Sequence, residues 1–168
     1  MKNDVNIIII GMPGSGKTTF GKALAKRLGR DFFDADDVIV EQEGKTIPEL
    51  FAVSEDCFRD AEVRATKALA VKNGIVVACG GGVIKRNVNI EIFKKTGVIL
   101  FLDRSPDDIV TDVDVATRPL LKDGKQKVFD LYDERIDLYR AAADYTLPNN
   151  KSIEEVLESL IQLIETIQ

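Results

Sequence analysis

The fold is decided by the stretch Ile7-Ile8-Ile9-Ile10-Gly11-Met12-Pro13-Gly14-Ser15-Gly16-Lys17-Thr18-Thr19. A β-branched run ends in a glycine-rich loop, and Phe20, Leu24 and Leu28 then recur at helical spacing. The loop matches the pattern G-x-x-x-x-G-K-[ST] in full. Glycines allow backbone N–H groups to point inward and form an anion nest at a helix N-terminus. The flanking strand and helix favour this interpretation over a chance Gly/Ser turn.

The loop residues predict a bound nucleotide. The ammonium of Lys17 would supply a point charge to the β- and γ-phosphates. The hydroxyl of Thr18 would hold Mg²⁺, because this ion prefers oxygen ligands. The expected ligand is therefore a magnesium nucleotide.

Length and charge limit the remaining possibilities. The chain has 168 residues and is 45% hydrophobic, which suits a single domain over 1–168. Its net charge of −5 gives no electrostatic footprint for nucleic acid or an anionic membrane. No apolar run could span a bilayer, and no signal-peptide pattern is found. We expect a cytoplasmic protein without nucleic-acid or membrane partners.

The residue types present also limit the chemistry. The chain has no histidine, which excludes Ser/His and Cys/His catalytic arrangements and histidine metal sites. Cys57 and Cys79 have no metal-binding spacing and are expected to be reduced, buried thiols. Any proton acceptor is therefore expected to be a carboxylate.

Five apolar runs alternate with helical patterns: Val5–Ile10, Asp31–Asp34, Ile75–Cys79, Val98–Leu102 and Tyr145–Leu147. Such alternation predicts crossover units and a parallel sheet with helices on both faces, a three-layer α/β fold. The turn-rich stretch 112–127 interrupts this pattern and is predicted to be a mobile loop over a site.

Asp34 and Asp36 follow the second apolar run. A spacing of two puts both carboxylates on one side of an extended chain. The carboxyl ends of parallel strands meet at one edge, so both could reach the γ-phosphate and Mg²⁺. One could hold the metal while the other accepts a proton from a hydroxyl acceptor. The alternative is an acidic cluster that caps the next helix, which is stabilising by itself.

Arg59, Glu62 and a glycine run form two further candidates. Arg59 and Glu62 share a helix face, which is compatible with a surface ion pair or with an arginine fork for a substrate carboxylate. Gly80, Gly81 and Gly82 follow a buried-looking strand. Three glycines are costly unless the backbone approaches something closely, so we favour a ligand against this turn.

Two more arginines occur near the predicted loop. Arg118 begins the sequence Arg-Pro-Leu-Leu, and a closing loop could bring it to the transferred phosphoryl group. Arg135 shares a helix face with Tyr139 and could bind a carboxylate. Exposed, solvated arginines are the alternative at both positions.

Together, these motifs resemble the shikimate kinase family. The set comprises the phosphate loop, Asp34-x-Asp36, Phe58-Arg59 with Glu62, Gly80–Gly82, Arg118-Pro-Leu-Leu and Arg135-x-x-x-Tyr139, in that order. The resemblance runs from about residue 5 to about residue 147. It implies a P-loop kinase fold with a five-stranded parallel sheet in the order 2-3-1-4-5 and a short lid. The implied reaction is phosphoryl transfer from ATP to the 3-hydroxyl of shikimate, in aromatic amino-acid biosynthesis.

The resemblance also implies residue roles. The implied ATP-phosphate ligands are Gly14, Ser15, Gly16, Lys17, Thr18 and Thr19, with Arg118 reaching the phosphates from the lid. Thr18 and Asp34 would lie at Mg²⁺, and Asp36 would act as the base. Arg59, Arg135 and the Gly80–Gly82 backbone would hold shikimate within a substrate segment of about 34–62. We expect a monomer.

One position departs from the family. Members usually carry an arginine seven residues before the lid Arg-Pro-Leu-Leu, where it packs on adenine, and this chain has Thr111. A stacked guanidinium contributes about 1 kcal/mol, so Thr111 predicts weak ATP affinity or relaxed base selectivity. The alternatives to a shikimate kinase are a kinase for another hydroxylated acid, such as gluconate, and a non-catalytic nucleotide-binding relative.

Overall fold

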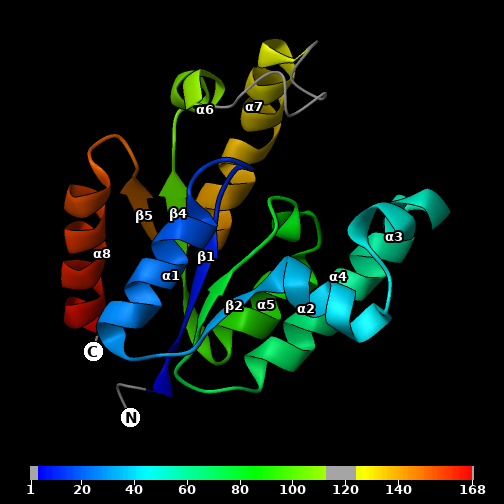
Figure 1. Ribbon diagram of the computed structural model, residues 1–168, viewed down its shortest axis with the longest axis horizontal. Coiled ribbons are helices and arrows are strands. Elements are labelled where there is room, and N and C mark those ends of the chain that lie inside the picture. The colour runs from blue at the N-terminus through cyan, green and yellow to red at the C-terminus, as the bar shows by residue number, and fades with distance from the viewer. Residues whose placement is uncertain (1–3, 113–123, 168) are drawn as a thin grey trace.

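The computed structural model, which describes residues 4–112 and 124–167, contains one parallel sheet between helices (Figure 1). The sheet order is β2-β3-β1-β4-β5, as predicted. The strands span β1 Asn6–Ile10, β2 Phe32–Asp34, β3 Val76–Ala78, β4 Gly97–Asp103 and β5 Tyr145–Pro148. The helices span α1 Lys17–Leu28, α2 Ala35–Glu43, α3 Ile47–Val53, α4 Glu55–Ala70, η2 Val83–Lys85, α5 Asn87–Lys94, α6 Pro106–Asp112, α7 Lys125–Ala142 and α8 Ile153–Ile167.

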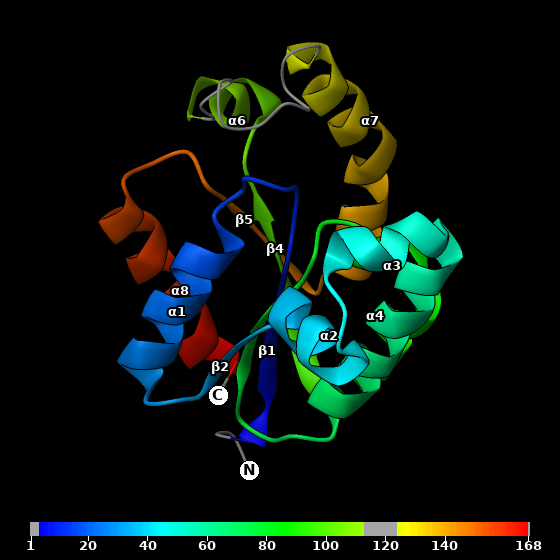
Figure 2. The ribbon, with the colours of Figure 1, turned by 45° about the vertical axis from the view of Figure 1, so that its right-hand side comes forward.

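The central strand β1 is buried on both faces. Ile7 and Ile9 pack with α1 and α8, whereas Ile8 and Ile10 pack with α4, α5 and α7. Because side chains alternate along a strand, four consecutive isoleucines supply both cores. Figures 1 and 2 show the corresponding helix layers on the two sides of the sheet.

A smaller core lies beside the sheet. Helices α2 and α3 pack on α4 around Ile39, Leu50 and Phe58, and Figure 2 shows the three helices together. The helix α4 thus has one side against the main core and another under α2 and α3. This arrangement fixes the start of α4 next to the carboxyl edge of the sheet.

Serine side chains cap the starts of helices α6 and α8. Ser105 Oγ accepts a hydrogen bond from the Asp108 amide at 3.2 Å, and Ser152 Oγ accepts one from the Glu155 amide at 3.2 Å. These bonds satisfy donors that lack a partner within the first turn of a helix.

The boundaries of the predicted loop 112–127 are wrong at both ends. Asp112 is the last residue of α6, and α7 already begins at Lys125 because Val128 N can donate to Gly124 O, closing its first turn. The part between them, including Arg118, lies outside the described residues. Among the helices within 4–112 and 124–167, none is both long and apolar enough to cross a membrane.

Candidate functional site

The phosphate loop joins β1 to α1 at the carboxyl edge of the sheet. Gly16 precedes α1 with φ +100°, a left-handed conformation that favours glycine. A Cβ on Gly11 would lie 2.7 Å from the carbonyl oxygen of Leu102 in β4. Glycine at position 11 therefore lets the loop pass close to the neighbouring strand before it turns.

Lys17 lies within the curve of this loop. Its Nζ donates to the carbonyl oxygens of Gly11 and Met12, both at 2.8 Å, and the side chain is almost wholly buried. Burial lowers the pKa of Lys17 to about 8, and the carboxylates of Asp36 and Asp34 oppose this effect. A buried cation held by neutral carbonyls is suited to an incoming anion.

Asp34 has two hydrogen-bonding roles. Its Oδ1 accepts a bond from the Asp36 amide at 3.0 Å, which caps α2. Its Oδ2 accepts a bond from the Thr18 hydroxyl at 3.1 Å. Capping and proximity to the phosphate loop are thus combined in one residue. The Thr18 hydroxyl oxygen and Asp34 Oδ2 face each other. Mg²⁺ is usually bound by one or two such protein oxygens, and phosphates and water complete its coordination.

Asp36 faces the glycine run after β3. A Cβ on Gly80 would lie 3.1 Å from Asp36 Oδ1, so glycine leaves room for this carboxylate. Burial, followed by the nearby charge of Asp34, raises the pKa of Asp36, and Lys17 opposes the rise. A carboxylate with a raised pKa accepts a proton more readily than an ordinary one.

Arg59 and Glu62 are buried, with 8% and 3% of their surfaces exposed. The surface ion-pair interpretation is therefore wrong. Arg59 Nη1 donates to Glu62 Oε1 at 2.9 Å, and its Nε donates to Glu55 at 3.3 Å. The guanidinium also lies 4.9 Å from the centre of the Phe58 ring. Burial raises the pKa of Glu62, and the adjacent Arg59 opposes that rise.

The glycine run contacts both predicted substrate arginines. A Cβ on Gly82 would lie 2.5 Å from Arg59 Nη1 and Nη2, and one on Gly81 would lie 3.3 Å from Arg135 Nη1. The Tyr139 hydroxyl donates to the carbonyl oxygen of Gly81 at 2.6 Å. The Nε of Arg135 is buried and has no hydrogen-bond partner among the described residues. Guanidinium groups from α4 and α7 therefore converge on one turn.

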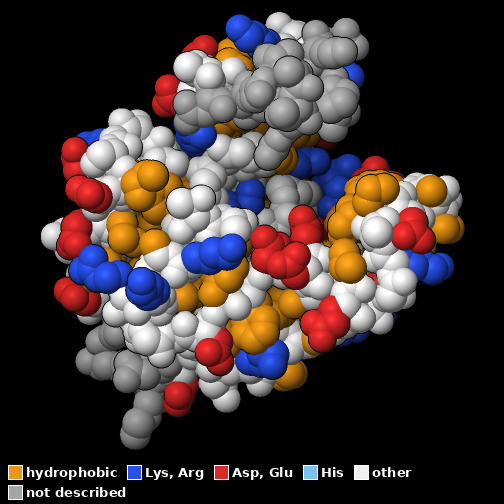
Figure 3. All heavy atoms as spheres, viewed as in Figure 1, with side chains coloured by type: hydrophobic (Ala, Val, Ile, Leu, Met, Phe, Trp, Pro, Cys, Tyr) orange, Lys and Arg blue, Asp and Glu red, His pale blue; other side chains and the backbone are white. Residues whose placement is uncertain are grey.

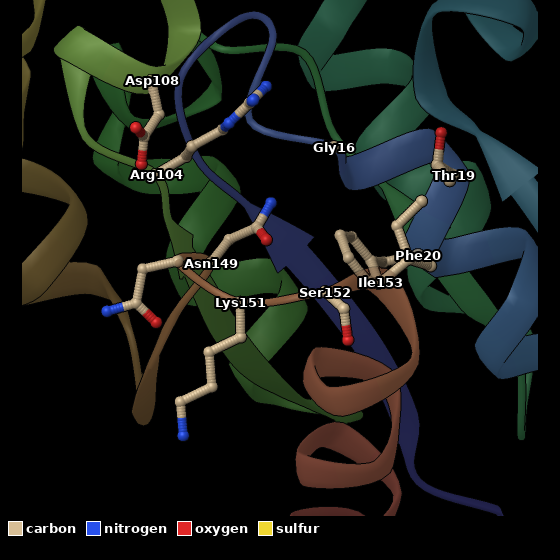
Figure 4. A pocket seen from close by; sticks show the side chains of 10 residues that line it. Gly16, Thr19, Phe20, Arg104, Asp108, Asn149, Lys151, Ser152 and Ile153 are labelled. Carbon is tan, nitrogen blue, oxygen red and sulfur yellow. The ribbon is translucent and has the colours of Figure 1, made fainter.

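A cavity of about 530 Å³ adjoins the other side of the phosphate loop (Figure 4). It is lined by Gly16, Thr19, Phe20, Arg104, Asp108, Asn149, Asn150, Lys151, Ser152 and Ile153. Arg104 donates to Gly14 O at 3.0 Å and Asn149 donates to Ser15 O at 2.8 Å. Sequence reasoning missed Arg104, although its position just after β4 was a usable signal.

The surface is hollowed between the end that carries α6 and α7 and the rest of the molecule (Figure 3). Lys and Arg side chains gather in this recess, and acidic side chains lie at its lower rim. The recess can therefore hold anionic ligands next to carboxylates.

Three comparisons agree on one family. A family model described as shikimate kinase matches residues 13–165. A shikimate kinase from Clostridium botulinum (strain Alaska E43 / Type E3) is 44% identical over 164 residues, covering 98% of each chain. A solved shikimate kinase from Acinetobacter baumannii, in complex with shikimate, superposes with a TM-score of 0.89 at 34% identity, covering 98% of this chain and 95% of the other.

The chain belongs to the shikimate kinase family. Within the shikimate kinase pattern, Thr111 remains the unusual residue. Its hydroxyl donates to the Asp107 carbonyl at 2.8 Å, and it does not line the cavity beside the phosphate loop. Arg104 is the guanidinium that does line this cavity. The prediction of weak ATP affinity or relaxed base selectivity stays a prediction.

Proposed function

We propose that this chain transfers the γ-phosphoryl group of ATP to the 3-hydroxyl of shikimate, giving shikimate 3-phosphate and ADP. The observation that carries the proposal is the convergence of Lys17, Asp36, Arg59 and Arg135 around the Gly80–Gly82 turn. A phosphate-binding lysine, a carboxylate with a raised pKa and two guanidinium groups are the parts that phosphoryl transfer to a carboxylated alcohol requires.

The donor is bound by the phosphate loop. Backbone amides of Gly14, Ser15, Gly16, Lys17, Thr18 and Thr19 surround the phosphates, and the Lys17 ammonium exchanges its carbonyl partners for phosphate oxygens. The adenine base of ATP enters the cavity beside Arg104 and Asn149, whose side chains donate hydrogen bonds to the phosphate loop. We assign Arg118, in a lid, to the phosphates during transfer, where its charge offsets the charge of the transition state.

The metal partner is Mg²⁺, held by Thr18 with Asp34 beside it. The hydroxyl and carboxylate oxygens are hard ligands of the type this ion accepts, which supports the assignment. When bound, Mg²⁺ neutralises charge on the β- and γ-phosphates.

The acceptor is bound by its carboxylate. Arg59 and Arg135 offer guanidinium donors at the Gly80–Gly82 turn, and the absence of side chains there lets a ring lie against the backbone. Glu62 holds Arg59 in its orientation through the bond at 2.9 Å.

Asp36 acts as the base. As the acceptor oxygen forms a bond to the γ-phosphorus, its proton passes to the Asp36 carboxylate and the bond to the leaving ADP oxygen breaks. The carboxylate faces Gly80 of the acceptor turn and lies near Lys17 of the phosphate loop, so it is placed between the proposed acceptor and phosphate sites. Catalysis then comes from positioning and charge neutralisation, with no covalent enzyme intermediate.

We further propose a monomeric, cytoplasmic enzyme with a single domain. All groups invoked above come from one chain, which supports a monomer. ATP is abundant in the cytoplasm, which supports the location.

The test is ADP production from Mg-ATP with shikimate, compared with gluconate and with no acceptor. Of these three reactions with Mg-ATP, we expect rapid ADP release only in the one that contains shikimate, with shikimate 3-phosphate as the second product. Release with gluconate but not shikimate would assign another small-molecule kinase. ATP binding without turnover on any acceptor would assign a non-catalytic nucleotide-binding protein.

A further inference from the structure

Glu55 links two cations at the start of α4. Its Oε2 accepts a hydrogen bond from Arg59 Nε at 3.3 Å, and the same oxygen contacts Lys85 Nζ at 2.6 Å. On its other side, Arg59 donates to Glu62 at 2.9 Å. The guanidinium is therefore bound by two carboxylates before any substrate is present.

Two carboxylates on one guanidinium leave a net negative charge. An anionic acceptor approaching Arg59 would then meet Glu55 and Glu62 as well. Arg135 on α7 and Lys85 on η2 supply the positive charge that offsets them, and Asp36 on α2 is the remaining nearby acid. The charges of these six groups cancel when Lys85 is counted, and without Lys85 they leave a net negative charge at the acceptor site.

Lys85 is held firmly relative to the glycine turn. It ends η2, and its amide donates to the carbonyl oxygen of Gly82 at 3.0 Å. A Cβ on that same Gly82 would touch the Arg59 guanidinium. About a third of the Lys85 side chain is exposed, so its ammonium lies at the rim.

We propose that Lys85 is a positioning residue that removes the repulsion of an anionic substrate from the acceptor site, by neutralising Glu55 next to Arg59. This rests on the proposed binding of the acceptor carboxylate by Arg59. Lys85 does not contact the acceptor and takes no part in proton or phosphoryl transfer. Its contribution is electrostatic, so salt screens it.

Arg86 offers a matched control. It follows Lys85 and also bridges to α4, with Nη1 on Asp60 at 2.5 Å and Nη2 on Asp56 at 3.4 Å. In the described contacts, neither of these acids bonds to Arg59. Loss of Arg86 therefore removes one positive charge and two ion pairs to α4 without changing the partners of Arg59.

The test compares steady-state kinetics of Lys85→Met, Arg86→Met, Glu55→Gln and the double variant Glu55→Gln/Lys85→Met. For Lys85→Met we expect the shikimate KM to rise about threefold to tenfold at low salt, with kcat and the ATP KM unchanged. At about 0.5 M salt the difference should fall below about twofold. Arg86→Met should keep the wild-type shikimate KM.

The double variant distinguishes charge from structure. Glutamine at position 55 can still accept a hydrogen bond from Arg59 Nε but carries no charge. We therefore expect the double variant to return to within about twofold of the wild-type KM, and Glu55→Gln alone not to raise it.

Three results would overturn the proposal: an unchanged KM in Lys85→Met, an equal rise in Arg86→Met, or a double variant no better than Lys85→Met. Wild-type enzyme without shikimate-dependent turnover would instead reject the proposed function. Thermal melting of each variant shows whether it is folded, so that its KM can be compared with that of the wild type.

Discussion

In the proposed mechanism, Asp36 serves activity at the cost of stability. Burial raises the pKa of its carboxyl group, the nearby Asp34 charge adds to the rise, and Lys17 opposes it. A carboxyl group whose pKa is raised by folding stabilises the protein only while it is protonated. That contribution is present below its ordinary pKa of 3.8 and is lost as the pH rises through the raised value.

Replacing Asp36 with asparagine should therefore separate activity from stability. We expect kcat to fall about 100- to 10,000-fold, because the proton acceptor is lost, with little change in ATP affinity. At neutral pH we expect Tm to rise by about 2–4 °C, which corresponds to about 1 kcal/mol in a chain of this length. Steady-state kinetics, nucleotide titration and thermal melting measure the three quantities.

The control is Asp37→Asn on the same turn, because Asp37 is exposed. This variant should keep kcat within about twofold, as expected for a surface substitution. An Asp36→Asn enzyme that turned over like the wild type would show that another group accepts the proton.

Lys17 gives a second prediction at the residue scale. Its folded pKa of about 8 lies below the ordinary 10.5, so the folded protein binds fewer protons than the unfolded chain between these values. The free energy of unfolding of the ligand-free protein should therefore rise with pH across that window. ATP phosphates restore the charge, so binding above about pH 8 should take up protons.

Calorimetry in buffers of different ionisation enthalpy measures this proton uptake. Lys22→Met should retain the uptake, because Lys22 is exposed on α1. Lys17→Met should lose the uptake along with turnover. Wild-type binding without proton uptake at such a pH would contradict the lowered pKa.

At the scale of elements, the turn between β3 and η2 forms one wall of the proposed acceptor site. Gly82 has φ −96°, which any residue can adopt, so glycine is required there for space and not for backbone conformation. A methyl group at position 82 would occupy the place of the Arg59 guanidinium. The flexible end of the arginine can move away without disturbing the core.

Gly82→Ala should therefore impair binding more than folding. We expect the shikimate KM to rise about tenfold, about 1.4 kcal/mol, with a nearly unchanged Tm. Gly29→Ala provides the opposite case, because Gly29 has φ +66° and a Cβ there would meet no atom within 4 Å. It should lower stability by about 1 kcal/mol and leave KM unchanged. A Gly82→Ala enzyme with a lower Tm and normal KM would contradict this account.

Most elements could be predicted from the sequence because their signals are local. The isoleucines of β1 and the capping serines of α6 and α8 each depend on neighbours in the chain. The burial of Arg59 was not predictable in this way. Its partner helices α2 and α3 precede it, and spacing within α4 says nothing about what covers that helix.

At the scale of the whole molecule, the carboxyl ends of the strands carry the candidate site, whereas their amino ends contribute to stability. The carboxyl edge brings together residues at or beyond the ends of β1, β2 and β3 that lie far apart in sequence, and the rule for parallel sheets predicted that edge. The same rule could not predict which side chains would pair there. The position of Arg104 after β4 indicated the correct edge of the sheet, but its contact with Gly14 depends on packing between distant segments. The spacing of Glu55 and Arg59 was a local signal, and only the contact of Glu55 with Lys85 depends on such packing.

The amino edge is held by Asn6, the first residue of β1, which is fully buried. Its Nδ2 donates to the Lys72 carbonyl at 2.7 Å, and its Oδ1 accepts from the Ile75 amide at 3.1 Å. The side chain thus ties the central strand to the segment before β3. This link is at the opposite end of the strand from the phosphate loop.

Asn6→Ala should therefore destabilise the protein without changing its chemistry. The buried Ile75 amide would lose its partner, at a cost of about 1–3 kcal/mol, and the part-buried Lys72 carbonyl would lose a donor as well. We expect Tm to fall by about 5–10 °C, while kcat and both KM values at 25 °C stay within about twofold of the wild type. Asn6→Asp should lower Tm further than Asn6→Ala at neutral pH, because it buries a carboxylate charge against the Lys72 carbonyl oxygen. A change in KM without a change in Tm would contradict this prediction. It would show that the amino edge of the sheet influences the site without contributing to stability.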